Sequence, residues 1–324
     1  MTTGIPARGK WEGGASLAVV GAGPAGLTAA MQACRLGVET LLFEADRPGG
    51  FLLTAWRVEN FPGFPRPLAG ARIARLLLRQ AEARGVVVSA DRIEAVEPGP
   101  DRFRLTGRSG RYEAVAVILA TGSRSRRLAL PGAAALEGER LFYRADRLLE
   151  RLPAPPSVLV IGGGEAAFDQ ALMVAGGGAR VTLALRGRRD RALPEQAAAV
   201  RRAGIEVRRE HRPAGLEKSG EIVAVSFHTD RGEERIETAA VLAAIGKEPD
   251  WSLVPAAAKG PGGEPATDLA GETALPGLYL AGDLRRGPHR QGAIAAGDGM
   301  AAALAAAAHI GRKGERRDGD HRST

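Results

Sequence analysis

The sequence predicts an α/β protein with two three-layer, Rossmann-like dinucleotide-binding domains, the second inserted into the first. Two glycine fingerprints of the same shape, at residues 21–26 and 162–167, each follow a short apolar run. A last apolar strand at residues 277–281 and a helical pattern after it close the chain. Because the first domain is incomplete before residue 125, these last elements are expected to return to it.

The first fingerprint contains Gly21, Gly23, Pro24, Ala25 and Gly26, and a helical pattern runs from Pro24 to Gly37. Glycines permit a tight turn between strand and helix and let backbone N–H groups approach a pyrophosphate. Glu44 lies 23 positions after Gly21 and ends the next strand-like run. An acid at this place accepts hydrogen bonds from a ribose diol, which predicts a dinucleotide site.

The second fingerprint contains Gly162, Gly164, Glu165 and Ala166. Leu185 occupies the position that matches Glu44, and Arg186 follows it. An arginine at this place suits a 2′-phosphate, although a solvated arginine cluster is the alternative. The chain is therefore predicted to bind two different dinucleotides.

The remaining patterns set the predicted domain limits. A second helix is expected over residues 68–85, strands over 86–89, 103–106 and 115–120, and a final helix from about Arg290 to His309. We assign residues 1–125 and 246–324 to the first domain and residues 126–245 to the inserted domain. The charged tail at residues 311–318 is expected to be solvated and disordered.

Composition narrows the function classes. No apolar run in the 324 residues reaches the roughly 18 residues of a membrane span, and the N-terminus lacks the apolar core of a signal peptide. A single cysteine, Cys34, excludes an internal disulfide and favours a cytoplasmic location. The five histidines form no metal-ligand pattern. The net charge is +8, but only 4% of residues are aromatic, which disfavours nucleic-acid binding and leaves an acidic protein partner open.

Six motifs occur along the chain in a specific order. They are Gly-x-Gly-Pro-Ala-Gly at 21–26, Val-Glu-Asn-Phe-Pro-Gly-Phe-Pro at 58–65, Ala-Thr-Gly at 120–122, Gly-x-Gly-x-x-Ala at 162–167, Ala-Ile-Gly at 244–246, and Ala-Gly-Asp at 281–283 followed by Arg290-Gln291. This order resembles the low-molecular-weight thioredoxin reductase family from residue 17 to about residue 308. The resemblance implies FAD in the first domain, NADPH in the inserted domain, and a homodimer.

The resemblance also implies contacts for individual residues. FAD contacts are implied for the first fingerprint, Glu44, Gly50, Asn60, Ala120, Thr121, Gly122, Gly282, Asp283, Arg290, Gln291 and Ala293. Glu44 would hold the adenosine ribose and Asp283 the ribityl chain, and the residues from Arg290 to Ala293 would meet the flavin pyrimidine edge. Asp283 has a helix cap as its alternative role. NADPH contacts are implied for the second fingerprint, Arg186, Arg188, Arg191, Ile245 and Gly246.

The chain departs from the family at the redox dithiol. The family carries a Cys-x-x-Cys pair between the Ala-Thr-Gly strand end and the second fingerprint, but the matching stretch at residues 141–147 is Leu-Phe-Tyr-Arg-Ala-Asp-Arg. Cys34 falls on the first fingerprint helix at a spacing that suits the core. In lacking the pair, the chain is similar to the ferredoxin/flavodoxin-NADP reductases of the same scaffold, which pass electrons from flavin to a carrier protein.

We therefore expect an FAD-dependent oxidoreductase that takes hydride from NADPH and delivers electrons to an external acceptor. A ferredoxin- or flavodoxin-like carrier is favoured over a small-molecule acceptor. A disulfide reductase without its own dithiol and a non-catalytic redox sensor are the alternatives. Trp56 is a candidate to stack on the flavin or to pack at an interface, and His289 is a candidate proton donor or a loop residue without a catalytic role.

Overall fold

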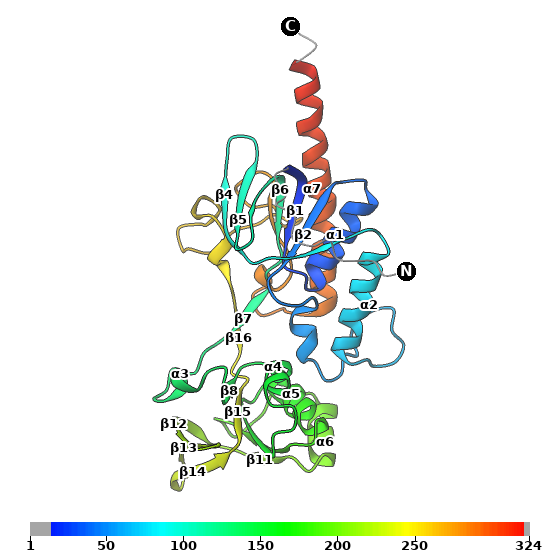
Figure 1. Cartoon of the computed structure of the whole chain (residues 1–324). Coiled ribbons are helices and arrows are strands. Elements are labelled where there is room, and N and C mark those ends of the chain that lie inside the picture. The colour runs from blue at the N-terminus through cyan, green and yellow to red at the C-terminus, as the bar shows by residue number, and fades with distance from the viewer. Residues whose placement is uncertain (1–13, 321–324) are drawn as a thin grey trace.

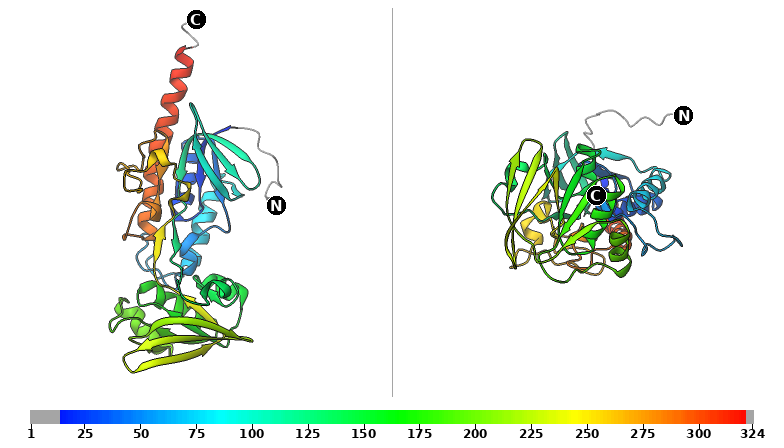
Figure 2. Two further views of the ribbon diagram at one scale, coloured as in Figure 1. Left: turned by 90° about the vertical axis from the view of Figure 1, so that its left-hand side faces the viewer. Right: turned by 90° about the horizontal axis from the view of Figure 1, so that it is seen from below.

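Two short strands carry the chain between two structural units (Figure 1). The structure is a computed structural model and describes residues 14–320. β7 (Ser123–Ser125) leads out of the first unit, and β16 (Lys247–Pro249) returns to it, antiparallel to β7. The crossing is narrow in the views of Figures 1 and 2. The domain limits at residues 125 and 246 remain a proposal from the sequence.

A seven-stranded sheet forms the centre of the first unit. Its parallel strands are β1 (Gly14–Val20), β2 (Thr40–Glu44), β3 (Val88–Ala90), β6 (Arg111–Leu119) and β17 (Leu278–Leu280). β5 (Phe103–Gly107) pairs antiparallel with the first half of β6, and β4 (Ile93–Pro98) pairs with β5. Because β17 pairs with the second half of β6, the end of the chain completes this sheet.

Alternating side chains give the sheet two apolar faces. Leu17 and Val19 of β1 face a layer of helices: α1 (Pro24–Arg35), α2 (Gly70–Glu82) and α7 (Gly292–Asp320). Ala18 and Val20 face the opposite side, where they pack with side chains of β4 and β5, the antiparallel part of the same sheet, and with the 3₁₀ turns η2 (Trp251–Leu253) and η3 (Ala256–Ala258). Figure 2 shows α7 running along the helical side of this unit.

The second unit repeats this plan. Its parallel sheet has the order β11-β10-β9-β15-β8, from the strands β8 (Leu141–Phe142), β9 (Ser157–Ile161), β10 (Arg180–Ala184), β11 (Glu206–Arg208) and β15 (Ala240–Ala243). One face packs on the helices α4 (Ala145–Arg151), α5 (Glu165–Gly176) and α6 (Pro194–Arg202). The other face packs on α3 (Ala133–Leu136) and on the antiparallel strands β12 (Arg212–Ser219), β13 (Ile222–Thr229) and β14 (Gly232–Thr238).

The predicted fold class is confirmed, with two differences. In each unit, antiparallel strands pack on the side of the parallel strands that faces away from the helices, and β4 and β12–β14 are not among the strands predicted from the sequence. The tail at residues 311–318, expected to be disordered, is helical, because α7 continues to Asp320. Arginine, lysine and glutamate favour helix, which outweighs the two glycines of this segment. The Lys313 side chain also donates a hydrogen bond to the Asp101 carbonyl at 2.8 Å.

Helix α7 contains a 22-residue stretch, Gly292–Lys313, that is long and apolar enough by length and composition alone to cross a membrane. Its buried side chains include Ala302, Ala303 and Ala306, which pack in the core with α1. The same composition is expected of a core helix that covers a sheet, and this packing gives the stretch that role.

The contact between α7 and α1 depends on a glycine. A Cβ atom at Gly299 would lie 2.0 Å from the Ala25 carbonyl oxygen, whereas a Cβ at Gly297 would meet nothing within 4 Å. We expect Gly299→Ala to lower the free energy of unfolding by about 1–3 kcal/mol through overpacking. The matched control Gly297→Ala, on the exposed face of the same helix, should raise it by up to about 1 kcal/mol. Urea unfolding of both variants measures this, and equal effects would contradict the packing argument.

Candidate functional site

A cleft of about 790 Å³ opens where the parallel strands of the first unit end. Its walls include the turn after β1, the loop after β2, the segment after β6 and the start of α7. The second unit contributes residues of α5 and α6, and the crossing strands contribute Ser123 and Lys247. Ligands of parallel α/β sheets bind at this edge, outside the carboxyl ends of the strands.

The first fingerprint forms the turn between β1 and α1, and its glycines have different tasks. Gly21 has φ +102°, and a Cβ atom there would lie 2.5 Å from the Ala120 carbonyl oxygen. A Cβ at Gly26 would lie 1.7 Å from the Gly21 carbonyl oxygen. Gly23 lines the cleft, and its Cβ would meet only Gly50, at 4.0 Å. Gly21 and Gly26 are therefore required by backbone packing, and Gly23 leaves room for a ligand.

Glu44 ends β2 beside this turn and lines the cleft. Its Oε2 accepts a hydrogen bond from the Ala22 N–H at 2.8 Å, and its Oε1 accepts one from the Asp46 N–H at 3.0 Å. Burial raises the pKa of Glu44 above its ordinary value, and the hydrogen bond from Ala22 offsets part of that rise. A carboxylate has further lone pairs, so Glu44 retains acceptor capacity toward the cleft.

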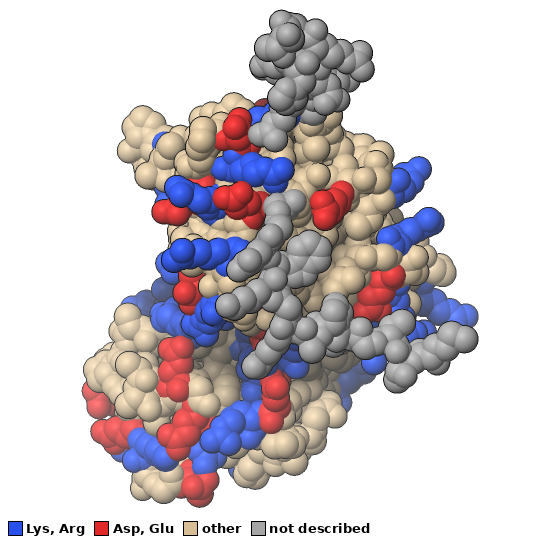
Figure 3. Space-filling view, turned by 45° about the horizontal axis from the view of Figure 1, so that its top comes forward, with Lys and Arg blue, Asp and Glu red and all other residues tan. Residues whose placement is uncertain are grey.

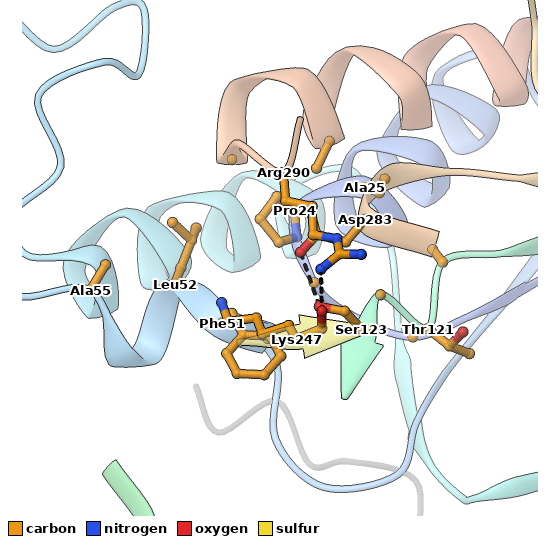
Figure 4. Close-up of a pocket in the computed structure, with 18 of the residues that line it drawn as sticks. Pro24, Ala25, Phe51, Leu52, Ala55, Thr121, Ser123, Lys247, Asp283 and Arg290 are labelled. Carbon is orange, nitrogen blue, oxygen red and sulfur yellow. Dashed lines mark hydrogen bonds between the residues drawn. The ribbon is translucent and has the colours of Figure 1, made fainter. Parts of the chain in front are cut away.

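At the other end of the cleft, residues far apart in the sequence meet. The Asn60 side-chain amide donates to Gln291 Oε1 at 3.0 Å, across 231 positions of sequence. Ser123 Oγ donates to Asp283 Oδ2 at 3.2 Å, as the dashed line in Figure 4 shows. Asp283 lies on the short turn η4 (Gly282–Leu284), directly after β17. The tertiary structure thus gathers the motifs at 58–65, 281–283 and 290–291 in one place.

Thr121 Oγ1 and Arg290 Nε are buried in this region, and neither has a hydrogen-bond partner among the described residues. Arg290 does donate through Nη1 to the Lys247 carbonyl at 2.7 Å (Figure 4). Buried polar atoms are costly without a partner, so both atoms fit a polar ligand in the cleft. Together with the open space at Gly23 and the acid Glu44, they fit a bound dinucleotide such as FAD.

The structure brings most of the predicted FAD residues to the cleft. The lining contains Gly21, Gly23, Pro24, Ala25, Glu44, Gly50, Asn60, Ala120, Thr121, Gly122, Gly282, Asp283, Arg290 and Gln291. Gly26 and Ala293 do not line it. Gly26 packs against the turn. At the start of α7, Gly292 and Ala295 line the cleft in place of Ala293.

The two candidate catalytic residues differ in position. Trp56 lines the cleft and also packs against the helical core of the second unit, which is the interface role that the sequence left open. His289 is exposed and lies outside the cleft, in a turn where its N–H donates to the Arg286 carbonyl at 2.9 Å. The turn before Arg290 directs the His289 side chain to solvent.

Three side chains that the sequence analysis did not single out also meet in the cleft. The Lys247 ammonium lies 3.6 Å from the centre of the Phe51 ring (Figure 4). The Arg144 guanidinium lies 4.9 Å from the centre of the same ring. Burial lowers the pKa of Lys247 to about 8. The positions of two of these residues in the sequence could have indicated that they belong to the site. Lys247 directly follows the Ala-Ile-Gly motif, and Arg144 lies in the stretch that matches the family's dithiol.

The second unit places an unusual carboxyl group at the cleft. Burial raises the pKa of Asp169, on α5, to about 6. Gln196 of α6 donates a hydrogen bond to Asp169 Oδ1 at 2.9 Å and offsets part of this rise. Raised carboxyl pKa values are common where a site is arranged for ligand binding or proton transfer.

The first glycine of the second fingerprint lies as close to a backbone carbonyl as that of the first. Gly162 has φ +154°, and a Cβ there would lie 2.4 Å from the Ala244 carbonyl oxygen. The Arg191 N–H donates to the Gly163 carbonyl at 2.8 Å, which holds the arginine loop against the fingerprint. Glu165 lines the cleft, whereas Gly162, Gly164 and Ala166 do not.

The predicted 2′-phosphate residues lie around that loop. Arg186 and Arg191 are exposed, and Arg188 forms an ion pair with Glu210 at 2.6 Å. Ile245 and Gly246 follow β15, and the Gly246 carbonyl accepts a hydrogen bond from the Arg126 N–H at 3.0 Å, where the chain crosses between the units.

On the face in Figure 3, basic and acidic side chains are interspersed over both units. Among residues 14–320, no group of three or more His, Cys, Asp or Glu side chains is placed to hold a metal ion.

Comparisons with known proteins agree with this site. A family model described as pyridine nucleotide-disulphide oxidoreductase matches residues 15–308. The chain is 34% identical over 299 residues to the thioredoxin reductase of Treponema pallidum, covering 90% of this chain and 96% of that protein. It is 30% identical over 309 residues to the 34.2 kDa protein in rubredoxin operon of Clostridium pasteurianum, covering 94% and 100%.

Two solved thioredoxin reductases show the same fold. The Lactococcus lactis enzyme in its FR conformation superposes with a TM-score of 0.82 at 25% identity, covering 92% of this chain and 99% of that chain. The Giardia duodenalis enzyme has the same identity and the same coverages but a TM-score of 0.57. The chain belongs to the pyridine nucleotide-disulphide oxidoreductase family, as a thioredoxin-reductase-like, NAD(P)H-dependent flavoprotein oxidoreductase whose cofactors are FAD and NADPH.

Proposed function

We propose that this protein passes electrons from NADPH, through FAD, to a small electron-carrier protein and not to a dithiol of its own. The stretch where the family carries its Cys-x-x-Cys pair reads Arg144-Ala145-Asp146-Arg147, and this observation carries the proposal. Bound FAD would supply the chemistry by accepting a hydride and releasing electrons. Each NADPH then yields two electrons for two one-electron carriers, and one proton is released to solvent.

The residues of the cleft are assigned to the two ends of FAD within this proposal. Glu44 and the first fingerprint hold the adenosine and pyrophosphate, and Asp283, Arg290, Gln291 and Asn60 hold the flavin end. The N-terminus of α7 begins beside Gln291, and its partial positive charge favours negative charge at that place.

Replacing Glu44 tests the FAD assignment. We expect Glu44→Ala to weaken FAD binding by about 10- to 150-fold, because charge-assisted hydrogen bonds worth about 1.5–3 kcal/mol are lost. Flavin absorbance per protein and titration of the apoprotein with FAD measure this. Glu113→Ala, at an exposed position of β6 in the same sheet, is the matched control and should retain FAD. Full retention of FAD by the Glu44 variant would contradict the assignment.

Arg186 and Arg191 are proposed to bind the 2′-phosphate of NADPH, with Arg188 as an auxiliary contact because it already pairs with Glu210. The native enzyme should prefer NADPH over NADH by at least about tenfold in kcat/KM, since each charge-assisted contact contributes about 1.5–3 kcal/mol. Arg186→Ala should erode this preference. Arg235→Ala, an exposed arginine of the same unit, should leave it unchanged. Equal native rates with NADPH and NADH would refute the assignment.

The one cysteine does not replace the missing pair. Cys34 is half-buried on α1, packs against the helical core of the first unit and does not line the cleft. Burial raises the pKa of its thiol, which reduces the thiolate fraction needed for disulfide exchange. The thioredoxin reductases among the relatives are therefore a guide to the fold and cofactors but not to the acceptor.

Two observations support a carrier protein as the acceptor. One relative is encoded, by its name, in a rubredoxin operon, which links a homologue to a small electron carrier. The net charge of +8 speeds encounters with an acidic partner. The second candidate function is reduction of a disulfide held wholly by the substrate, and the family description favours it.

Stopped-flow mixing of the NADPH-reduced enzyme with ferredoxin, flavodoxin, rubredoxin or thioredoxin distinguishes these functions. We expect rapid reoxidation by a carrier and slow reoxidation by thioredoxin, because thioredoxin's disulfide needs a thiolate partner. Cys34→Ser should leave carrier reduction unchanged. Rapid reoxidation by thioredoxin that disappears in Cys34→Ser would overturn the proposal.

A homodimer and a cytoplasmic location complete the proposal. The dimer follows from the family resemblance, and α7 presents Ile294 and Leu304 as exposed apolar side chains that a second subunit would cover.

A further inference from the structure

We propose that charged residues at the position of the missing dithiol hold the two units in one relative orientation, and that Asp46 and Arg147 are positioning residues for hydride transfer from NADPH. We call these residues the crossing cluster; they are Asp46, Arg47, Arg144, Asp146, Arg147 and Glu150. The proposal concerns reduction of the enzyme by NADPH, so it holds for any electron acceptor and is independent of the acceptor proposed above.

The ion pairs of the crossing cluster join the two units. Asp46 and Arg47 lie in the loop after β2 of the first unit, and the other four residues lie at or on α4 of the second. Arg47 contacts Asp146 at 2.5 Å and Glu150 at 3.7 Å. Arg147 pairs with Asp46 across the boundary and with Glu150 on its own helix at 2.6 Å. Both a cation and an anion of the first unit are thus paired with the second.

Arg144 adds a third link and orders the centre of the cluster. It donates two hydrogen bonds to Asp146, at 3.0 and 2.9 Å, and one to the Gly50 carbonyl of the first unit at 3.0 Å. The Asp146 side chain is only 7% exposed. Burial alone would raise the pKa of Asp146, but Arg144 and Arg47 outweigh it and hold the pKa below its ordinary value. Asp146 is therefore a shielded anion that cations from both units share.

Arg144 and Arg147 have the spacing of a Cys-x-x-Cys pair and lie in the stretch that matches it. The substitution therefore exchanges two thiols for two cations that contact the first unit. Further side-chain contacts across the boundary are the pair of Arg57 with Glu195 at 3.8 Å and the packing of Trp56 on the second unit's helical core. Since the backbone of residues 14–320 crosses between the units only at β7 and β16, these side chains carry much of the restraint on the angle between the units.

The comparison structures indicate that this angle is variable in the family. The Lactococcus and Giardia enzymes match the same share of this chain at the same identity, yet their TM-scores differ. A difference of this size at equal coverage is expected when two similar units are turned relative to each other. In this chain, the crossing cluster favours the arrangement that superposes well on the Lactococcus FR conformation.

Charge reversal of one surface pair tests the proposal in the full-length, FAD-loaded enzyme. Asp46→Arg and Arg147→Asp each place like charges face to face, and the double variant restores opposite charges. Spin labels at R84C on the first unit and D230C on the second, in a Cys34→Ser background, report the distance between the units; both positions are exposed. Glu94→Arg, which disrupts the Arg108–Glu94 pair within the first unit, is the matched control. Flavin absorbance verifies FAD content in each variant.

We expect each single reversal to broaden the distance distribution and to slow flavin reduction by NADPH by about 10- to 100-fold, an effect typical of misplaced reacting groups. The dissociation constant for NADPH should stay near the native value, because the arginine loop is untouched. The double variant should recover the native distance distribution and come within about twofold of the native rate, as coupled sites do in a double-mutant cycle. Unchanged distances in the single variants, or a double variant as impaired as the singles, would overturn the proposal.

Raising the salt concentration tests the same ion pairs without charge reversal, so the result does not depend on the folding of the charge-reversal variants. In the labelled enzyme with an otherwise native cluster, salt is raised from about 0.01 M to about 1 M, which shortens the Debye length from about 30 Å to about 3 Å. Broadening of the distance distribution with salt supports the proposal, because partly exposed ion pairs are screened. A distribution that does not change with salt contradicts it.

Discussion

The architecture depends on the close approach of backbone at the carboxyl ends of the parallel strands. Gly21 leaves no room for a Cβ beside the Ala120 carbonyl, and Gly26 leaves none beside Gly21. The same restriction recurs in the second unit, where Gly162 lies against the Ala244 carbonyl. These approaches set where each helix starts relative to its sheet, and therefore where backbone N–H groups and the helix dipole face a phosphate. The cleft is the consequence of this packing.

The repetition of the plan explains how one chain holds two dinucleotides. In each unit, helices cover one face of a parallel sheet and antiparallel strands cover the other, so the ligand edge of each sheet stays free. The two edges are brought toward each other across β7 and β16, and the cleft has walls from both units. Electron transfer between two cofactors requires this convergence, since neither unit alone presents both sites.

Loss of the dithiol changes both the chemistry and the mechanics of the boundary. Thiols relay electrons by exchange, whereas arginines cannot accept electrons and instead bind carboxylates and carbonyl oxygens. At Arg144 and Arg147, the chain uses this property to connect α4 to the loop after β2. Lys247 and Phe51 meet in the cleft wall nearby, and the Lys247 ammonium adds a further positive charge to this region.

The sequence by itself determined the fold class, the order of the two dinucleotide units and part of the lining of the cleft. Glycine turns and the acid Glu44 could be recognised because the chemistry of a strand–turn–helix unit depends on residues close together in the chain. The family resemblance places Asn60 and Gln291 in one site but does not predict that they contact each other. Their hydrogen bond is visible only in the tertiary structure.

Only the tertiary structure decided what lies between the units. Lys247, Phe51, Asp169 and the crossing cluster come together because of the angle between two separately folded units, and no local pattern encodes that angle. In the tertiary structure, His289 lies outside the cleft, and Trp56 packs against the second unit. The extension of α7 to Asp320 shows the same limit, because charged composition alone indicates solvation and does not distinguish a solvated helix from a disordered tail.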